Sequence, residues 1–532
     1  MSTLPTRRTL TRLVLSLAIL TAALAPAMPA EASWRSLTGR LPAYVGSVPY
    51  KISPDSRTVI FVVDKDTDDV YELYSVPITG TTPIKLNPPL VANGDVNLSR
   101  FFFTTDSQSV IYLADQEVDN RVDMYRVPVG GGASVKLNPP LVAGGNVTDF
   151  KIDPDSGRVI YVADQETNEV FELWSVLGAG GGLVKLNGAF VSGGNISTYA
   201  IDRLSDRVVY SADQETNGKY ELYSVPVAGG AVTKLNPPIT LAGGGDSGLS
   251  DWAINPIIPV VVFIAREAGS LGGRVYMIPT AGGVPLTQLS FNLLATQRML
   301  SFRISPAGDR VVFNVGNSLP GQNAFKGNLY SALIGGGGAA NVTETADPLF
   351  GTDNYFFLPD GSRVVYTFQN NAGAPPRLES ATMLGVRAPL YVPGASDPLL
   401  SFFRLSADSQ WVMYQTSGDY LARGLNTIPP GGGSPTNHGA AEFALMLPDS
   451  SRIVYQRATG PGNHTDLFSA QIFGGDQREL SGLLGLGYVG DVQASADSQW
   501  IVFNVQIDSR YELRVSDGAQ APPPVFLPLV QR

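Results

Sequence analysis

One segment recurs along almost the whole chain, and residues 148–187 are its clearest copy. This copy reads TDFKIDPDSGRVIYVADQETNEVFELWSVLGAGGGLVKLN and contains four short apolar runs, TDFKID, RVIYVAD, VFELWSV and GLVKLN. Runs rich in Val, Ile and Tyr, separated by Pro, Asp, Gly and Asn, are typical of β-strands and their turns. A four-stranded meander of this size cannot bury both of its faces alone, so it requires neighbouring copies.

An aromatic residue that ends a VIY-type triplet marks the length of the repeat. It occurs at Phe61, Tyr112, Tyr161, Tyr210, Phe263, Phe313, Tyr366, Tyr414, Tyr455 and Phe503. The successive spacings are 51, 49, 49, 53, 50, 53, 48, 41 and 48 residues. A repeat of this length with four strands indicates a β-propeller, because a helical or leucine-rich solenoid would show helical periodicity. No stretch after Ala32 keeps such a periodicity.

The sequence therefore predicts an all-β fold, a propeller of four-stranded antiparallel blades over residues 49–532. Uninterrupted spacing favours one ten-bladed ring, and two smaller propellers are the alternative. An open arc is disfavoured because its terminal blades would expose sheet edges. The outer strand of the last blade could come from the N-terminal segment at 33–48, over residues 36–48, or from PVFLPLV at 524–530.

The first 32 residues have the pattern of an export signal. Three arginines within residues 7–12 precede an apolar run at 13–24, and small residues follow up to Ala32. The apolar run is too short to cross the ~30 Å hydrocarbon core of a membrane. We predict cleavage near Ala32 and a bacterial protein that is exported, periplasmic or extracellular, without membrane insertion. Adjacent arginines in the signal leave the twin-arginine route open beside the general one.

Composition narrows the classes of partner. The chain has no Cys, which excludes disulfides and thiolate metal sites. Cleavage after Ala32 would remove three Arg and one Glu from 37 basic and 47 acidic residues, leaving a net charge of −12. This charge favours solubility and disfavours nucleic acid and anionic lipid surfaces as partners.

Three segments of the first repeat carry a resemblance to a known family. SPDSRTVIF (53–61), DVYELYSVP (69–77) and IKLN (84–87) are similar to the repeat of the TolB-like propeller family, and the similarity extends from about Tyr50 to Val530. The resemblance implies an exported, non-enzymatic binding or scaffolding propeller. The chain departs from TolB in having ten repeats instead of six and no evident N-terminal α/β domain. The resemblance therefore does not imply the role of TolB itself.

The first four repeats share an acidic hairpin loop, reading DKDTDD, DQEVDN, DQETNE and DQETNG. Equivalent loops lie on one face of a propeller, so their carboxylates would form an arc that binds a cationic partner or calcium. The candidate residues are Asp64, Asp66, Asp68, Asp115, Glu117, Asp164, Glu166, Asp213 and Glu215. Asp64, Asp66 and Asp68 alternate like the start of a calcium loop, but Asp69 and Ser75 replace its Gly and Glu. Solvated loop tips copied by duplication are the alternative explanation.

Other notable residues have structural explanations. Edge protection accounts for the outermost-strand lysines Lys85, Lys136, Lys185 and Lys234. Core packing accounts for Trp174, Trp252, Trp411 and Trp500. The GDSG at 245–248 resembles a serine-protease loop, but His438 and His464, the only histidines, are expected far along the chain on Gly- and Pro-rich loops.

Two functional hypotheses follow. The first is a binding or scaffold propeller without catalysis, an exported monomer with a protein or glycan partner and no cofactor other than possible calcium. The alternative is a propeller-type glycoside hydrolase or lyase with paired carboxylates at the central funnel. The obvious acids of the innermost strands are Asp149, Asp153, Asp202 and Asp251.

Overall fold

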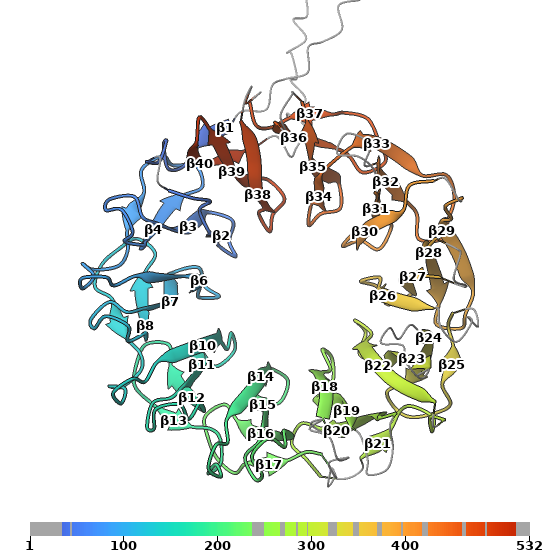
Figure 1. Ribbon diagram of the computed structural model, residues 1–532, viewed down its shortest axis with the longest axis horizontal. Helices are drawn as coiled ribbons and strands as arrows, with labels where there is room; N and C mark the ends of the chain where they lie inside the picture. Colours follow the sequence, from blue (N-terminus) through green and yellow to red (C-terminus); the bar gives the residue numbers. More distant parts are fainter. Residues whose placement is uncertain are drawn as a thin grey trace, which may run out of the picture.

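The chain forms a single closed ring of ten blades around a central channel (Figure 1). The computed structural model describes residues 34–42, 45–236, 249–265, 272–283, 286–294, 296–317, 327–343, 351–369, 375–394, 397–417, 424–459, 464–482, 484 and 487–517. The predicted signal at 1–32, GDSG at 245–248 and PVFLPLV at 524–530 lie outside these residues. The prediction of one ten-bladed propeller is confirmed.

Each blade is an antiparallel meander whose first strand lies nearest the channel. Blades 1 to 3 are β2 (Tyr50–Ile52), β3 (Thr58–Val63), β4 (Glu72–Pro77), β5 (Ile84–Lys85); β6 (Val96–Phe103), β7 (Ser109–Ala114), β8 (Asp123–Pro128), β9 (Val135–Lys136); and β10 (Val147–Ile152), β11 (Arg158–Ala163), β12 (Glu172–Leu177), β13 (Val184–Lys185). Blades 4 to 6 are β14 (Ile196–Asp202), β15 (Arg207–Ala212), β16 (Glu221–Pro226), β17 (Thr233–Lys234); β18 (Leu249–Ile254), β19 (Val260–Ala265), β20 (Arg274–Pro279), β21 (Thr287–Gln288); and β22 (Gln297–Ile304), β23 (Arg310–Asn317), β24 (Gly327–Leu333), β25 (Ala340–Asn341).

The remaining blades follow the same order, with one exception at the end of the chain. Blades 7 to 9 are β26 (Thr352–Phe357), β27 (Arg363–Phe368), β28 (Arg377–Thr382), β29 (Arg387–Tyr391); β30 (Leu400–Leu405), β31 (Val412–Thr416), β32 (Gly424–Ile428), β33 (Thr436–Ala440); and β34 (Phe443–Met446), β35 (Arg452–Ala458), β36 (Thr465–Gln471), β37 (Arg478–Glu479). Blade 10 is β38 (Tyr488–Ala494), β39 (Ile501–Ile507), β40 (Arg510–Ser516) and, as its outer strand, β1 (Trp34–Ser36).

The hydrophobic core lies between blades, as a meander too thin to bury its own faces requires. Every residue of the second strand β11 is buried. One cluster joins Ile111 and Met124 of blade 2 to Phe150, Tyr161 and Trp174 of blade 3. Burying one such side chain contributes about 1.5–3 kcal/mol relative to leaving it in water. Each blade is therefore stabilised mainly by its two neighbours.

The N-terminal segment closes the ring. Trp34 to Ser36 pair with β40, so the outer strand of blade 10 comes from the N-terminal segment, as one of the two predictions had it. The strand ends where the predicted range 36–48 begins, and the two share only Ser36. Further along, Asn504 of β39 binds the backbone of Val48 with both amide atoms, at 3.0 and 3.4 Å. The guanidinium of Arg514 stacks 3.7 Å from the centre of the Trp34 ring. The pairing and the Arg514–Trp34 contact fix the N-terminal segment to blade 10, and the Asn504–Val48 bonds continue this attachment up to the start of blade 1.

A second device links neighbouring blades through the turn between their first two strands. The serine after the turn aspartate is left-handed at Ser56, Ser107, Ser409, Ser450 and Ser498. Its hydroxyl accepts a hydrogen bond from the aspartate N–H of the preceding blade. The bonds are Asp55–Ser107 at 3.2 Å, Asp360–Ser409 at 2.9 Å, Asp408–Ser450 at 3.0 Å, Asp449–Ser498 at 2.9 Å and Asp497–Ser56 at 3.2 Å.

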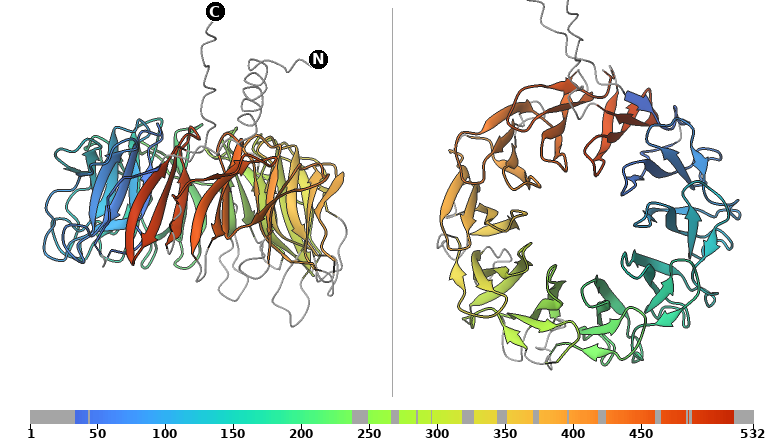
Figure 2. Two further views of the ribbon diagram at one scale, coloured as in Figure 1. Left: turned by 90° about the horizontal axis from the view of Figure 1, so that it is seen from above. Right: turned by 180° about the vertical axis from the view of Figure 1, so that it is seen from behind.

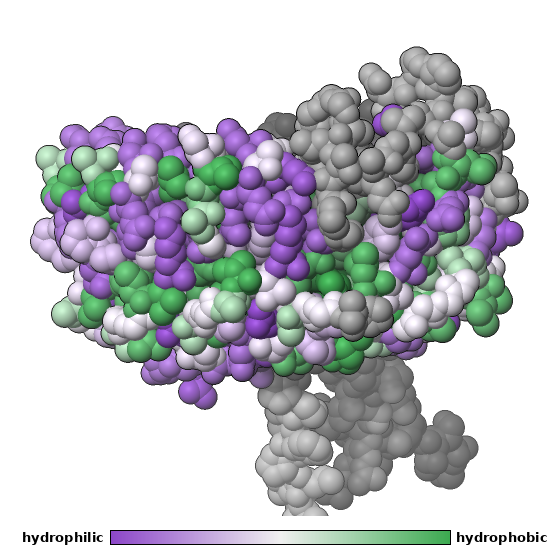
Figure 3. Space-filling view, turned by 90° about the horizontal axis from the view of Figure 1, so that it is seen from below, coloured by the Kyte–Doolittle hydropathy of each residue, from purple (hydrophilic) through white to green (hydrophobic). Residues whose placement is uncertain are grey.

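Figure 2 shows the ring from its edge, with the strands running between its two faces. We call the side with the loops between second and third strands, and the connectors between blades, the hairpin face; the opposite side is the turn face. Exposed apolar side chains gather towards the turn face, which is the lower half of the rim in Figure 3. They include Val135, Leu177, Leu183, Leu204, Ile257, Leu333, Leu384, Val386 and Phe473. Within the described residues, no helix is long and apolar enough to cross a membrane.

Candidate binding face

The nine predicted site residues all lie on the hairpin face, in the loops that follow β3, β7, β11 and β15. Their side chains serve three different purposes according to their position in the loop. The structure places them on adjacent blades, along one side of the ring (Figure 1).

The first aspartate of the loop is a structural residue in blades 2, 3 and 4. Asp164 accepts the N–H of Asn146 at 2.6 Å and that of Glu169 at 3.0 Å, tying the connector to the hairpin tip. Asp115 and Asp213 make the same pair of bonds. The connector must approach closely, and a Cβ on Gly145 would lie 2.6 Å from the Asp164 carbonyl oxygen. These three carboxylates are thus unavailable to a partner.

The third residue of each loop belongs to an ionic triad with a lysine of the outer strand. Lys185 lies 2.9 Å from Glu166 and also contacts Glu172, a buried acid at the start of β12. Its counterparts link Lys85 to Asp66 and Glu72, Lys136 to Glu117 and Asp123, and Lys234 to Glu215 and Glu221. Burial lowers the pKa of Lys185, but hydrogen bonds to Glu172 and Glu166 outweigh this effect and leave the pKa raised.

The triads give the outer-strand lysines a role besides edge protection. Constant spacings along the sequence mark them in all four blades. Each lysine follows the loop acid by 19 residues and the buried acid by 13, in all four blades. Trp174 adds a cation–π contact, with its ring centre 5.4 Å from the Lys185 nitrogen. The loop acids remain about half exposed, with 57% of the Glu166 side chain accessible.

The second residue of each loop also has a structural partner. Gln165 is buried and accepts a hydrogen bond of 2.7 Å from the Tyr161 hydroxyl. Blades 2 and 4 repeat the pair as Tyr112–Gln116 and Tyr210–Gln214. Blade 1 has Phe61 and Lys65 instead, so loss of the hydroxyl accompanies loss of the glutamine. The DQE motif therefore encodes the hairpin's own packing.

Four acids of the hairpin tips remain without a basic partner among the described residues. They are Asp68, Asp69, Asp119 and Glu169, all exposed. Sequence reasoning included only Asp68 among its candidates. Asp95 lies beside them at the start of blade 2, where blades 3 and 4 have Asn146 and Asn195. Burial raises the pKa of Asp95, and the nearby charges of Asp115, Asp69 and Asp119 add to the rise.

Three of the four predicted acids of the innermost strands, Asp149, Asp153 and Asp202, each have a partner of their own. Asp149 pairs with Arg100 across blades 2 and 3 at 3.3 Å. Asp153 and Asp202 are buried and bind the serines of their own turns, Ser156 and Ser205. Within the described residues, no hydrogen bond joins any two of Asp149, Asp153, Asp202 and Asp251.

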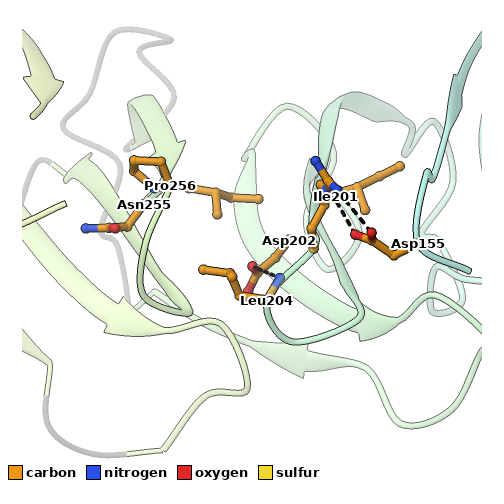
Figure 4. A pocket seen from close by; sticks show the side chains of 8 residues that line it. Asp155, Ile201, Asp202, Leu204, Asn255 and Pro256 are labelled. Atoms are coloured by element: carbon orange, nitrogen blue, oxygen red, sulfur yellow. Dashed lines mark hydrogen bonds and ion pairs between the residues drawn. The ribbon is translucent and has the colours of Figure 1, made fainter. Parts of the chain in front are cut away.

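Asp202 lines a pocket of about 520 Å³ on the turn face (Figure 4). Its carboxylate points to its own turn, where it accepts the N–H of Leu204 at 3.1 Å. At the other end, Arg203 forms a two-pronged ion pair with Asp155, at 2.7 and 3.0 Å, which joins blades 3 and 4. The polar groups of this pocket therefore hold the ring together.

The remaining candidates fit structural roles. Trp174, Trp252, Trp411 and Trp500 pack against hydrophobic clusters between blades. The prediction of a loop was wrong for His438, which is half-buried on strand β33 because residues 436–440 pair with β32. Its Nε2 lies 2.9 Å from the Thr427 hydroxyl. Burial lowers the pKa of His438.

Fold and site together define a ten-bladed β-propeller with an acidic hairpin face. Neither a family model nor a curated protein matches the chain.

Solved structures are similar to it at the level of the fold. A eukaryotic initiation factor has a TM-score of 0.46 and 12% identity, over 81% of this chain and 96% of that one. A putative TolB from Agrobacterium tumefaciens has a TM-score of 0.28 and 18% identity, over 45% and 79%. An oligogalacturonate lyase in complex with manganese has a TM-score of 0.33 and 14% identity, over 72% and 90%. The TolB-like family assignment therefore stays a prediction.

Proposed function

We propose that the protein is a non-catalytic binding ring that engages a cationic protein partner through its hairpin face. One observation carries the proposal: Asp68, Asp69, Asp119 and Glu169 are exposed at hairpin tips of adjacent blades and have no basic partner among the described residues. Repeated carboxylates of one sign attract a lysine- or arginine-rich surface and accelerate its association. The half-exposed loop acids of the triads add negative charge nearer the outer strands of the same blades.

The contacts of the inner-strand acids favour a binding role over a glycoside hydrolase or lyase activity. Both classes of glycosidase need two free carboxylates flanking the scissile bond, ~5–10 Å apart. Asp149 is neutralised by Arg100, and Asp153 and Asp202 bind their own turns. We further propose that the ring acts outside the cytoplasm as a monomer, which mass spectrometry of the mature N-terminus and the mass in solution would test.

The experiment is capture of partners from an envelope extract at low ionic strength, followed by elution with salt. The test variant is Asp119→Asn with Glu169→Gln, which removes two unpaired charges from the hairpin face. The control is Asp206→Asn with Asp309→Asn, which removes two exposed charges from the turn face.

We expect the test variant to lose the salt-eluted partner and the control to retain it. Loss of charge at a rim affects association most at low salt, so the difference between variants should shrink as salt rises. Equal capture by the wild type and the test variant would reject the hairpin face as the binding surface. Turnover of a polysaccharide by the purified ring would reject the non-catalytic assignment.

A further inference from the structure

The hairpin of blade 1 differs from its three counterparts in one buried atom. Asp64 is only 3% exposed, and its Oδ1 atom is fully buried without a hydrogen-bond partner. In blades 2 to 4 the corresponding aspartates accept backbone N–H groups with both oxygens, as Asp164 does from Asn146 and Glu169. A buried anionic oxygen without a donor is costly, because the group loses its hydration and gains nothing in return.

The missing donor has a topological cause. In blades 2 to 4 it comes from the connector that leads in from the preceding blade, such as Asn146. Blade 1 instead follows the ring-closing segment, which bonds to blade 10. Leu41 donates to the Tyr511 carbonyl at 3.0 Å, and Val48 donates to Asn504 at 3.4 Å. Ring closure thus takes away the backbone partner that Asp64 would otherwise have.

Two further carboxylates converge on Asp64. One carboxylate oxygen from each of Asp64, Asp68 and Asp69 lies within 4.8 Å of the others, and Asp68 and Asp69 face solvent. Asp66 is not part of this group, since it contacts Lys85 and accepts a hydrogen bond of 2.9 Å from Tyr74. The alternating pattern of residues 64, 66 and 68 therefore predicted two of the three converging acids, Asp64 and Asp68, and missed Asp69.

We propose that Asp64, Asp68 and Asp69 bind a calcium ion on the hairpin face of blade 1. Calcium takes oxygen ligands at about 2.3–2.6 Å, so two of its ligands lie at most about 5 Å apart. The ligand oxygens of the three acids lie within 4.8 Å of one another, which is inside that span. Magnesium requires near-ideal octahedral geometry and loses its water reluctantly, so it suits this irregular, partly exposed set of carboxylates less well. The exposed side of Asp68 and Asp69 leaves room for the waters that complete a coordination shell of six to eight.

Local charge supports the same assignment. Within the described residues no Lys or Arg forms an ion pair with Asp64, Asp68 or Asp69. The two lysines of blade 1 near this loop, Lys65 and Lys85, both pair with Asp66, at 4.0 and 3.6 Å. A divalent cation would neutralise these three acids, which leaves Asp119 and Glu169 as the unpaired charges of the hairpin face in the part of the chain that the structure describes.

The first test is titration of calcium chloride into the full mature chain after treatment with a chelator. We expect a saturable heat of binding, and a rise in melting temperature that the chelator reverses, because a ligand that binds only the folded state stabilises it. Magnesium chloride should give a clearly smaller rise. No calcium response, or an equal response to magnesium, would overturn the proposal.

The second test locates the ion with matched variants. Asp68→Asn should weaken calcium binding at least tenfold, whereas Asp119→Asn, the same loop position in blade 2, should leave the affinity unchanged. Asp64→Asn should abolish the response to calcium while raising the melting temperature of the metal-free protein, since it removes a buried unpaired charge. Full calcium binding by both Asp68→Asn and Asp64→Asn would overturn the assignment.

Discussion

The backbone N–H of Asp497 in blade 10 donates a hydrogen bond of 3.2 Å to the hydroxyl of Ser56 in blade 1, across 441 residues of sequence. Asp55 makes the same bond to Ser107, its neighbour one blade on. The first and last blades are thus joined by the same contact that joins blades adjacent in sequence. The left-handed serine is required for this geometry, with φ of 62° at Ser56.

We expect the serine bond at the ring closure to contribute as much to the free energy of unfolding as the same bond between blades that are adjacent in sequence. Ser56→Ala and Ser107→Ala should each lower the free energy of unfolding by about 1 kcal/mol, the usual net value of one hydrogen bond. Denaturant unfolding of the purified protein measures the change. Ser434→Ala, at an exposed position that has no hydrogen-bond partner in the described part of the chain, should stay within ~0.5 kcal/mol of the wild type. A negligible effect at Ser56 alone would mean that the closure does not depend on this bond.

The ionic triads predict that removing a lysine harms the protein through the acid left behind. Lys185→Met should lower the free energy of unfolding by about 1–3 kcal/mol, because Glu172 remains buried without its cation. Adding Glu172→Gln should recover much of the loss. Thermal or denaturant unfolding of the two variants at neutral pH provides the comparison. If the double variant is less stable than Lys185→Met, the buried charge is not the cause.

The hairpin tip of blade 3 contains a residue that is poorly suited to its backbone conformation. Glu169 has a φ of 64°, where the corresponding residues of blades 2 and 4 are Asn120 and Gly218. Asn adopts this conformation more readily than Glu, so Glu169→Asn should raise the free energy of unfolding by about 0.5–1 kcal/mol. Glu169→Gln separates conformation from charge, since it removes the charge alone. An equal gain from both variants would assign the effect to charge repulsion.

His438 predicts a loss of stability in mild acid. Its pKa is lowered in the folded state, chiefly by burial, so the unfolded chain binds the proton more readily. Stability from this residue is therefore present above its unfolded pKa of about 6.5 and declines as the pH falls below that value. The melting temperature should drop from pH 7.5 to 5.5, and His438→Gln should reduce the drop. An identical drop in the variant would assign the acid sensitivity to other groups.

The fold could be predicted because its information is local and repeated. Aromatic landmarks such as Tyr161 recur at nearly constant spacing, and apolar runs such as that of β11 reveal strands buried on both sides. Ring closure was left open between two segments because a strand of three residues, Trp34–Ser36, has no distinctive pattern. Its pairing with β40 depends on the shape of the completed ring.

The site was harder to predict because its acids are distinguished by distant partners. Asp164 and Glu166 look alike in the loop sequence, yet one binds backbone amides and the other a lysine 19 residues later. The repeated spacing of Lys185 and its counterparts was a usable signal. No comparable signal marks Asp64, whose distinction from Asp115 arises from a donor that blade 1 lacks.

The position of β1 in blade 10 has a consequence for biogenesis. This strand precedes every other described strand, yet its partner β40 is the last of them. During synthesis the early segment stays unpaired until nearly the whole polypeptide has been made. Pairing of this segment with β40 of another copy in that interval would link two chains, so a chaperone that covers it would favour closure of the ring within one chain.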